Sequence, residues 1–341
     1  MLAAVLTGLG GAGQLEIRDD LPVPVPAAGE VLVRVTAAAV NNTDINTRTG
    51  WYSRSQAGTH DSAWTGAAFQ LPRIQGADAC GYIAAVGAGI AVARIGERVL
   101  IDPVLRGAAG HAGPCGYLGA DRDGAFAQFT TVPAANAFTV HSAYTDAELA
   151  SFPCSYLAAE NMVSRAAIAH GEQVLISGAS GGVGSAAIQL ALRRGAVVTA
   201  LSSTTKAAAL RALGASRVLM RADELVTRLG QESVDAVIDS VGGSQFPAFL
   251  QLLRRGGRYA VAGAIGGAMV ELDLRTLYLK DLRLMGCTIP EPGTFARLLG
   301  YIERQEINPI VSATYALRDI HLAQQEFLRK QHVGKILLLL P

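Results

Sequence analysis

Two short segments of the chain carry residues whose types and spacing could do chemistry. The first, VNNTDINTRTG (40–50), is dense in amides, hydroxyls and one carboxylate, and it follows an apolar run at 31–40. The second, GASGGVG (178–184), lies between an apolar VLIS run and the helix-like SAAIQLALRRG. Polar side chains at the end of a strand can hold a metal ion or a substrate, but they also form turns and helix caps. A glycine-rich turn between a strand and a helix can bind phosphate groups.

The glycine-rich segment predicts a dinucleotide-binding loop. Ala179, Gly181 and Gly184 occupy the three positions of the G-x-G-x-x-G pattern, with alanine in place of the first glycine. A small first residue permits the tight turn, the second position lets the backbone approach a pyrophosphate, and the third lets the helix pack close to the strand. Because a strand, the loop, a helix and a second strand follow in order, we expect a Rossmann unit rather than an unrelated glycine-rich turn. The other residues expected to contact the cofactor here are Ser180, Gly182 and Val183.

The end of the second strand favours NADPH as the cofactor. An enzyme that uses NAD usually carries Asp or Glu at this point, where the carboxylate accepts a hydrogen bond from the ribose 2′-hydroxyl. This strand ends in ALSSTTK, so Ser202 and Ser203 stand where the carboxylate would be, and Lys206 follows one turn later. Two hydroxyls and an ammonium can bind a 2′-phosphate. The alternative for Lys206 is a solvated lysine in the first turn of a helix.

The spacing of apolar runs predicts an α/β protein with two domains. Residues 1–145 contain short apolar runs separated by Gly, Pro and Asp, which indicates a folded-over antiparallel β-domain. Across 146–287 strands alternate with helices, and this alternation indicates a doubly wound parallel sheet with helices on both faces. Helices are expected at 185–195, 204–213 and 244–254.

The composition argues against several classes of protein. Half of the 341 residues are apolar, and 29 Lys and Arg balance 28 Asp and Glu without a basic run. We therefore expect neither nucleic acid nor a membrane surface as a partner. The N-terminus lacks the basic region of a signal peptide, and the apolar tail ILLLLP is too short to span a bilayer. Together with four widely spaced cysteines, which fit reduced thiols, these features predict a cytoplasmic protein.

Four features together resemble the medium-chain dehydrogenase/reductase superfamily: GASGGVG, DSVGG (239–243), the β-rich N-terminal part and the closing VGKILLLLP. The resemblance covers essentially the whole chain. It implies a GroES-like catalytic domain at 1–145, completed by 288–341, with a Rossmann domain at 146–287 and the nicotinamide in a cleft between them. It also implies a homodimer through the edge of the Rossmann sheet, for which 258–274 could supply the edge. The further residues that it places along the cofactor are Val241, Gly242, Gly263, Ala264 and Ile265.

The first polar segment favours the zinc-free, quinone oxidoreductase-like branch of this superfamily. Zinc-dependent members typically show Cys-Gly-Thr-Asp-x-His, then Gly-His-Glu, then a later Cys. This chain has Asn41 and Ala77 at the first two ligand positions, and only Cys154 falls where a third could be. An amide and one thiolate do not supply the three good ligands of catalytic zinc, so no metal is expected. The potential ligands at 103–124, a poor substitute for a four-cysteine structural site, are His111, Cys115, Asp121 and Asp123.

A metal-free site suits a substrate that delocalises its own charge. Zinc polarises a carbonyl as a Lewis acid, whereas a quinone or an enone spreads the incoming charge over a conjugated system. Hydrogen-bond donors can then stabilise the enolate or phenolate, and the candidate donors are the Asn41 amide and the Tyr52 hydroxyl. Asp44 would orient neighbouring groups, and Tyr52 or water would supply the proton. The alternative is that these residues only form a turn or a helix cap, Asp44 above all.

The long segment 53–72 is expected to cover a substrate pocket lined by Trp51, Trp64 and Phe69, although a surface or subunit contact is the alternative. The preferred function is thus an NADPH-dependent reductase of small quinones, enones or related carbonyls. Two other functions stay open. One is an alcohol dehydrogenase with a degenerate zinc site, and the other is a catalytically weak NADPH-binding protein with a regulatory role.

Overall fold

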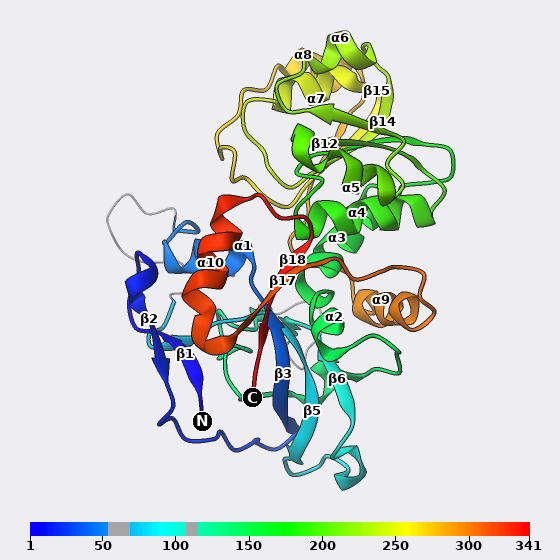
Figure 1. Cartoon of the computed structure of the whole chain (residues 1–341). Helices are drawn as coiled ribbons and strands as arrows, with labels where there is room; N and C mark the ends of the chain where they lie inside the picture. Colours follow the sequence, from blue (N-terminus) through cyan, green and yellow to red (C-terminus); the bar gives the residue numbers. More distant parts are fainter. Residues whose placement is uncertain (54–68, 107–114) are drawn as a thin grey trace. The chain divides into compact units, whose positions relative to one another are not determined.

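The computed structural model describes residues 1–53, 69–106 and 115–341 (Figure 1). The described chain divides into two compact units. The first contains Met1–Cys154, Val311–Gln331 and Lys335–Pro341, and the second contains Ser155–Ile310 with His332–Gly334. The sequence analysis assigned 146–154 to the Rossmann domain and 288–310 to the catalytic domain. In the structure, 146–154 group with the first unit and 288–310 with the second.

The first unit is built on a mostly antiparallel sheet in the order β10-β6-β5-β3-β18-β17, with β9 also pairing with β3. Its longest strand, β3, ends in three alanines, 37–39, and these residues and Val40 after them are fully buried. The chain therefore leaves this strand inside the protein, and the polar segment that follows starts in the interior. The strands are β3 (Glu30–Ala39), β5 (Asp78–Val86), β6 (Arg98–Ile101), β9 (Phe129–Pro133), β10 (Ala137–Thr139), β17 (Val311–Ala316) and β18 (Lys335–Leu339).

Smaller elements complete the first unit. A three-stranded sheet joins β2 (Leu15–Arg18), β1 (Ala3–Leu6) and β4 (Arg73–Ile74), and β7 (Val104–Leu105) pairs with β8 (Gly116–Tyr117). The helices are α1 (Asn42–Arg48), α2 (Asp146–Ala150) and α10 (Ile320–Arg329), and α3 (Pro153–Arg165) begins here and continues into the second unit. An apolar core that includes Val33, Ile83 and Phe126 fills the space between these elements.

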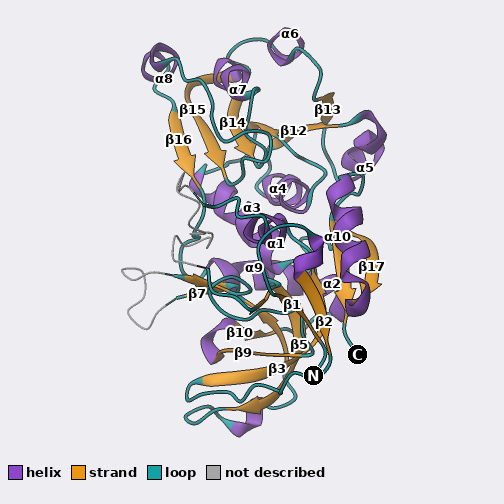
Figure 2. Cartoon of the chain, turned by 90° about the vertical axis from the view of Figure 1, so that its left-hand side faces the viewer, coloured by secondary structure: helices purple, strands orange, loops and turns teal. Residues whose placement is uncertain are grey.

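The second unit contains the doubly wound parallel sheet that the sequence predicted. Its strand order is β13-β12-β11-β14-β15-β16, and every neighbouring pair is parallel. This is the Rossmann order, with the first strand in the middle, and Figure 2 shows the arrows of β14, β15 and β16 pointing the same way. The strands are β11 (Gln173–Ile176), β12 (Val197–Ser202), β13 (Arg217–Met220), β14 (Val234–Asp239), β15 (Leu253–Val261) and β16 (Arg283–Gly286).

The helices of the second unit lie close to their expected positions. The helix expected at 185–195 is α4 (Gly182–Arg193), and the one at 244–254 is α7 (Phe246–Leu252). The one at 204–213 starts with a 3₁₀ turn at Thr204–Lys206 before α5 (Ala207–Ala212). The others are α6 (Leu225–Leu229), α8 (Leu274–Leu279) and α9 (Thr294–Glu303). Among the described residues, no helix is both long and apolar enough to span a membrane.

Candidate functional site

A buried carboxylate in the first unit gathers four segments of the chain. Asp78, the first residue of β5, is fully buried. Its Oδ1 accepts a hydrogen bond from the backbone N–H of Cys154 at 2.6 Å, and its Oδ2 accepts from Asn41 Nδ2 and Lys335 Nζ, each at 2.8 Å. Lys335 Nζ also donates to Asn41 Oδ1 at 2.5 Å. We refer to Asn41, Asp78, Cys154 and Lys335 as the Asp78 cluster.

The Asp78 cluster contains an ion pair that is shielded from water. Lys335 is 3% exposed, so both charges lose their hydration when the protein folds. A buried ion pair offsets this cost only when further hydrogen bonds satisfy its atoms, and the Asn41 amide and the Cys154 N–H supply such bonds here. The cluster therefore joins the beginnings of β5 and β18 to the helices α1 and α3.

Asn41 is occupied within this cluster. One hydrogen of its amide goes to Asp78 and the other to the backbone carbonyl of Ala39 at 3.2 Å, while its oxygen accepts from Lys335. The sequence analysis expected this amide to donate to a substrate, and the geometry does not favour that role. The physical reason is that β3 ends inside the protein, so the residue after it has to satisfy internal groups. Asn41 holds Lys335 and the start of α1 in place.

Asp44 caps the helix α1, as the alternative interpretation of the sequence suggested. Its Oδ2 accepts a hydrogen bond from the backbone N–H of Asn41 at 2.7 Å, and this contact satisfies a donor at the start of the helix. Burial raises the pKa of Asp44 to about 7, although the Asn41 N–H and the charge of Lys335 lower it. Asp44 therefore orients Asn41 through the backbone.

Tyr52 folds back onto α1. Asn46 Nδ2 lies 3.4 Å from the Tyr52 hydroxyl, and Thr43 also bonds to it. Burial raises the pKa of Tyr52, so this phenol is neutral at pH 7 and can donate a hydrogen bond or a proton. Of the expected pocket residues, Trp51 is 46% exposed and Phe69 packs against the apolar core. Trp64 lies outside the described residues.

A second phenol, which the sequence analysis missed, contacts Cys154. The Tyr117 hydroxyl donates to Cys154 Sγ at 3.2 Å. Burial raises the pKa of Cys154 to about 12 and raises that of Tyr117 as well. The thiol therefore stays protonated near pH 7, which disfavours a thiolate ligand or nucleophile.

The donor set of the Asp78 cluster does not fit a divalent cation. Both oxygens of Asp78 are engaged, and the ammonium of Lys335 contacts Asp78 and also Asn41, the residue at the first expected ligand position. Zinc needs several good ligands in one place. In the part of the chain that the structure describes, no group of three or more His, Cys, Asp or Glu residues could hold a metal ion.

The glycine-rich loop of the second unit has the geometry expected for binding a dinucleotide. Gly178 has a φ of +56°, in the left-handed region. A Cβ on Gly184 would lie 2.3 Å from the carbonyl oxygen of Gly178, so only glycine lets α4 pack this close to the strand. Gly181 is the N-cap of α4, a helix of 12 residues whose N-terminus favours an anion.

The end of β12 presents polar groups that suit a phosphate. Ser202 is 2% exposed, and its Oγ has no hydrogen-bond partner among the described residues. Lys206 Nζ lies 3.2 Å from Ser180 Oγ, and burial, with the charge of Arg221, lowers the pKa of Lys206. The backbone N–H of Arg221 donates to the Ser202 carbonyl at 3.1 Å. A phosphate near Ser202 would give an acceptor to the buried hydroxyl and a counter-charge to the lysine.

Two neighbouring loops hold the other residues expected along the cofactor. The carboxylate of Asp239 accepts hydrogen bonds from the hydroxyls of Ser177 and Tyr259 and from the backbone of the loop at 240–243. The N–H of Gly266 donates to the carbonyl of Val241 at 2.8 Å, so the loop at 262–267 lies beside it. Val241, Gly242, Gly263, Ala264 and Ile265 belong to these loops. The sequence analysis used Asp239 only as part of the DSVGG motif and did not predict that Asp239 and Tyr259 anchor the loop.

Comparisons with known proteins agree with this geometry. Residues 27–142 match the family described as the alcohol dehydrogenase GroES-like domain, and residues 182–304 match the zinc-binding dehydrogenase family. Quinone oxidoreductase from Rattus norvegicus is 28% identical over 97% of this chain and 95% of its own. Acryloyl-coenzyme A reductase from Metallosphaera sedula is 28% identical over 95% of each chain.

A solved structure extends the match over the whole chain. A protein from Sinorhizobium meliloti, provisionally assigned as an alcohol dehydrogenase, is 43% identical, with a TM-score of 0.92 over 100% of this chain and 97% of its own. The fold, the glycine-rich loop and these matches lead to one conclusion: the chain is an oxidoreductase of the medium-chain dehydrogenase/reductase superfamily.

Proposed function

We propose that the protein is a metal-independent reductase that uses NADPH to reduce a quinone, an enone or a related conjugated carbonyl. The observation that carries this proposal is the buried Lys335 ammonium, which pairs with Asp78 and donates to Asn41, the residue at the first expected metal-ligand position. Without a bound Lewis acid, the substrate has to delocalise the charge that develops during reduction. The names of the two curated relatives, a quinone oxidoreductase and an acryloyl-coenzyme A reductase, support this class of substrate.

In this mechanism NADPH, when bound, supplies a hydride. The protein has to orient the acceptor, stabilise the enolate or phenolate that forms, and deliver a proton. Tyr52 is the preferred proton donor, because burial keeps its phenol neutral and α1 fixes its hydroxyl through Thr43 and Asn46. A donor that is already oriented stabilises developing charge without reorganisation. The Asp78 cluster holds the first turn of α1, and it therefore contributes by positioning the helix that Tyr52 contacts.

NADPH is the proposed cofactor because of the groups at the end of β12. The buried Ser202 hydroxyl and the Lys206 ammonium suit a 2′-phosphate, and no carboxylate side chain occupies the end of this strand. Arg221 follows β13, the next strand of the sheet, and adds a second positive charge. The sequence analysis did not include Arg221, because the adjacency of β12 and β13 only emerges in the sheet.

The test is steady-state oxidation of NADPH with quinones, enones, aldehydes and simple alcohols, after the metal content of the purified protein has been measured. We expect turnover of the conjugated carbonyls at equal rates before and after treatment with a chelator. A stoichiometric metal ion that turnover of simple alcohols requires would instead favour the degenerate-zinc alcohol dehydrogenase. Tight NADPH binding with no turnover of any substrate would favour the regulatory function.

We also propose that the protein forms a homodimer through β16. The sequence analysis expected 258–274 to supply the edge of the sheet, but β15, which contains 258–261, lies inside the sheet between β14 and β16. The strand β16 ends the parallel sheet, and an edge strand can pair with a strand of another copy. The surface next to it is apolar: Leu284 on the strand and Tyr278 and Leu279 on α8 are 38%, 63% and 56% exposed. A second copy would cover this surface. The cytoplasmic location stays a prediction from the sequence.

A further inference from the structure

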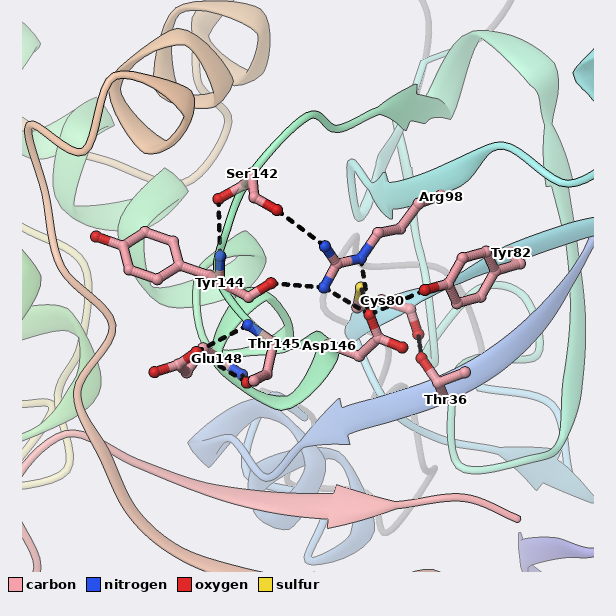
Figure 3. Close-up of polar contacts among 9 residues, drawn as sticks. All are labelled: Thr36, Cys80, Tyr82, Arg98, Ser142, Tyr144, Thr145, Asp146 and Glu148. Atoms are coloured by element: carbon pink, nitrogen blue, oxygen red, sulfur yellow. Dashed lines mark hydrogen bonds and ion pairs between the residues drawn. The ribbon is translucent and has the colours of Figure 1, made fainter.

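A polar cluster in the first unit fixes the chain that leads to Cys154. Arg98, at the start of β6, directs its guanidinium at the segment 142–146, where Nε donates to Asp146 Oδ1 at 2.7 Å. Its Nη atoms donate to the carbonyls of Tyr144 at 2.7 Å and Ser142 at 3.1 Å. Figure 3 shows the guanidinium facing these three residues. One side chain therefore holds two residues of the loop before α2 and the first residue of that helix.

Asp146 connects the same cluster to β5. Its Oδ1 accepts from the Tyr82 hydroxyl at 3.5 Å, and the thiol of Cys80 lies 3.9 Å from the same oxygen (Figure 3). Tyr82 and Arg98 are paired residues of the neighbouring strands β5 and β6. The first residue of α2 is thus tied to two adjacent strands, in addition to the local cap that Thr145 forms with Glu148.

The strand β5 and the segment 142–154 meet at a second point. Asp78, two residues before Cys80 on β5, accepts the backbone N–H of Cys154, which follows α2. β5 and this segment are therefore joined at two points, by the Tyr82–Asp146 contact, which the Arg98–Asp146 pair supports from β6, and by the Asp78–Cys154 contact. A displacement of α2 would be passed to the N–H that holds Asp78.

We propose that Arg98 and Asp146 are positioning residues for the Asp78 cluster. Their ion pair sets the start of α2, α2 sets the backbone of Cys154, and this N–H fixes the carboxylate that holds Asn41 and Lys335. The part that concerns catalysis rests on the proposed reductase function. The part that concerns geometry does not, because it can be measured on Cys154 without turnover.

The test variant is Asp146→Asn, which keeps a polar residue of the same size at the start of α2 and removes the charge. Its matched control is Glu30→Gln. Glu30 accepts from Arg122 at 2.6 Å in the same unit, and the side-chain exposures of that pair, 28% and 18%, resemble the 20% and 25% of Arg98 and Asp146. If Asp146→Asn does not fold, Arg98→Lys takes its place, because it keeps the charge and loses the fork-shaped contacts.

Two readouts decide the outcome. The first is the rate at which N-ethylmaleimide labels Cys154, followed by mass spectrometry of its peptide; the other three cysteines are buried. We expect Asp146→Asn to label at least about threefold faster and Glu30→Gln to label at the wild-type rate, because local opening raises the access to a thiol. The second is kcat, which should fall about tenfold in Asp146→Asn with the KM for NADPH unchanged.

Equal labelling in both variants would overturn the proposal, even if both lose stability, because Arg98 and Asp146 would then have only a structural role. Unchanged kcat in an active Asp146→Asn enzyme would also overturn it. If the wild-type protein turns over no substrate, the proposed function fails, and the labelling rates alone decide whether Asp146 positions Cys154.

Discussion

At the scale of single residues, the most consequential contact is the ion pair between Asp78 and Lys335, and it gives a prediction about stability. Lys335→Met would leave the Asp78 charge buried and without its cation. Breaking a buried pair in this way costs about 3–5 kcal/mol, so we expect the free energy of unfolding in urea to fall by about that amount. The double variant Asp78→Asn/Lys335→Met should lose less than the sum of the two single variants. Additive losses would mean that the two side chains are not coupled.

Asp44 gives a prediction about pH. Its pKa of about 7 in the folded protein lies above the ordinary value of 3.8, because burial disfavours the charged form. Between these two pH values the folded state binds the extra proton, so this residue contributes stability that is lost as the pH rises toward 7. Asp44→Asn lacks this titration and can still accept the Asn41 N–H. The variant should therefore gain stability relative to the wild type between about pH 4 and 7, by about 1.4 kcal/mol per pKa unit at most.

Urea unfolding of both proteins at several pH values measures this difference. Above pH 7 the difference should stay constant. A difference that does not vary from pH 4 to 8 would mean that the carboxylate keeps its charge throughout this range.

The cofactor preference can be tested at Lys206 and Arg221. Removing either positive charge should weaken NADPH binding about 10- to 100-fold, since a hydrogen bond to a charged group contributes about 1.5–3 kcal/mol. The affinity for NADH should not change, because NADH lacks the 2′-phosphate. Fluorescence titration with both cofactors measures this, and Arg211→Ala, an exposed arginine on α5, is the control. Equal affinity of the wild type for NADPH and NADH would contradict the assignment.

At the scale of elements, the sequence predicted the second unit well and the first unit only in part. The glycine-rich loop and the alternation of strands and helices are local patterns, and the strands β11 to β15 lie within such a pattern, whereas β16 was not predicted. The helix α1 entered the sequence analysis only through the alternative that Asp44 caps a helix, although Asn41 and Asp44 form a recognisable capping pair. The contact of Lys335 with Asp78 joins residues 257 positions apart. No local pattern reports such a contact, so neither the role of Lys335 nor the engagement of Asn41 could be foreseen.

The packing of α4 against β11 gives a prediction at this scale. Gly184→Ala would place a methyl group 2.3 Å from the carbonyl of Gly178, where backbone cannot yield cheaply. We expect the loop to shift and the affinity for NADPH to fall at least about tenfold, with a loss of about 1–3 kcal/mol in stability. Gly11→Ala is the control, because its added Cβ would contact nothing within 4 Å and its φ of −73° suits alanine. Equal affinity in both variants would mean that close packing of α4 does not govern binding.

At the scale of the whole molecule, the proposed dimer contact at the edge strand β16 can be tested. Leu284→Lys would place a charge on β16, and a charge on an edge strand opposes pairing with another strand. We expect the wild-type protein to run as a dimer in light scattering coupled to size exclusion, and this variant to run as a monomer at the same concentration. Leu322→Lys is the matched control, because Leu322 lies on α10 in the first unit and is 54% exposed. A wild-type protein that runs as a monomer would contradict the proposed dimer. A Leu284→Lys variant that still runs as a dimer would mean that the dimer contact lies elsewhere.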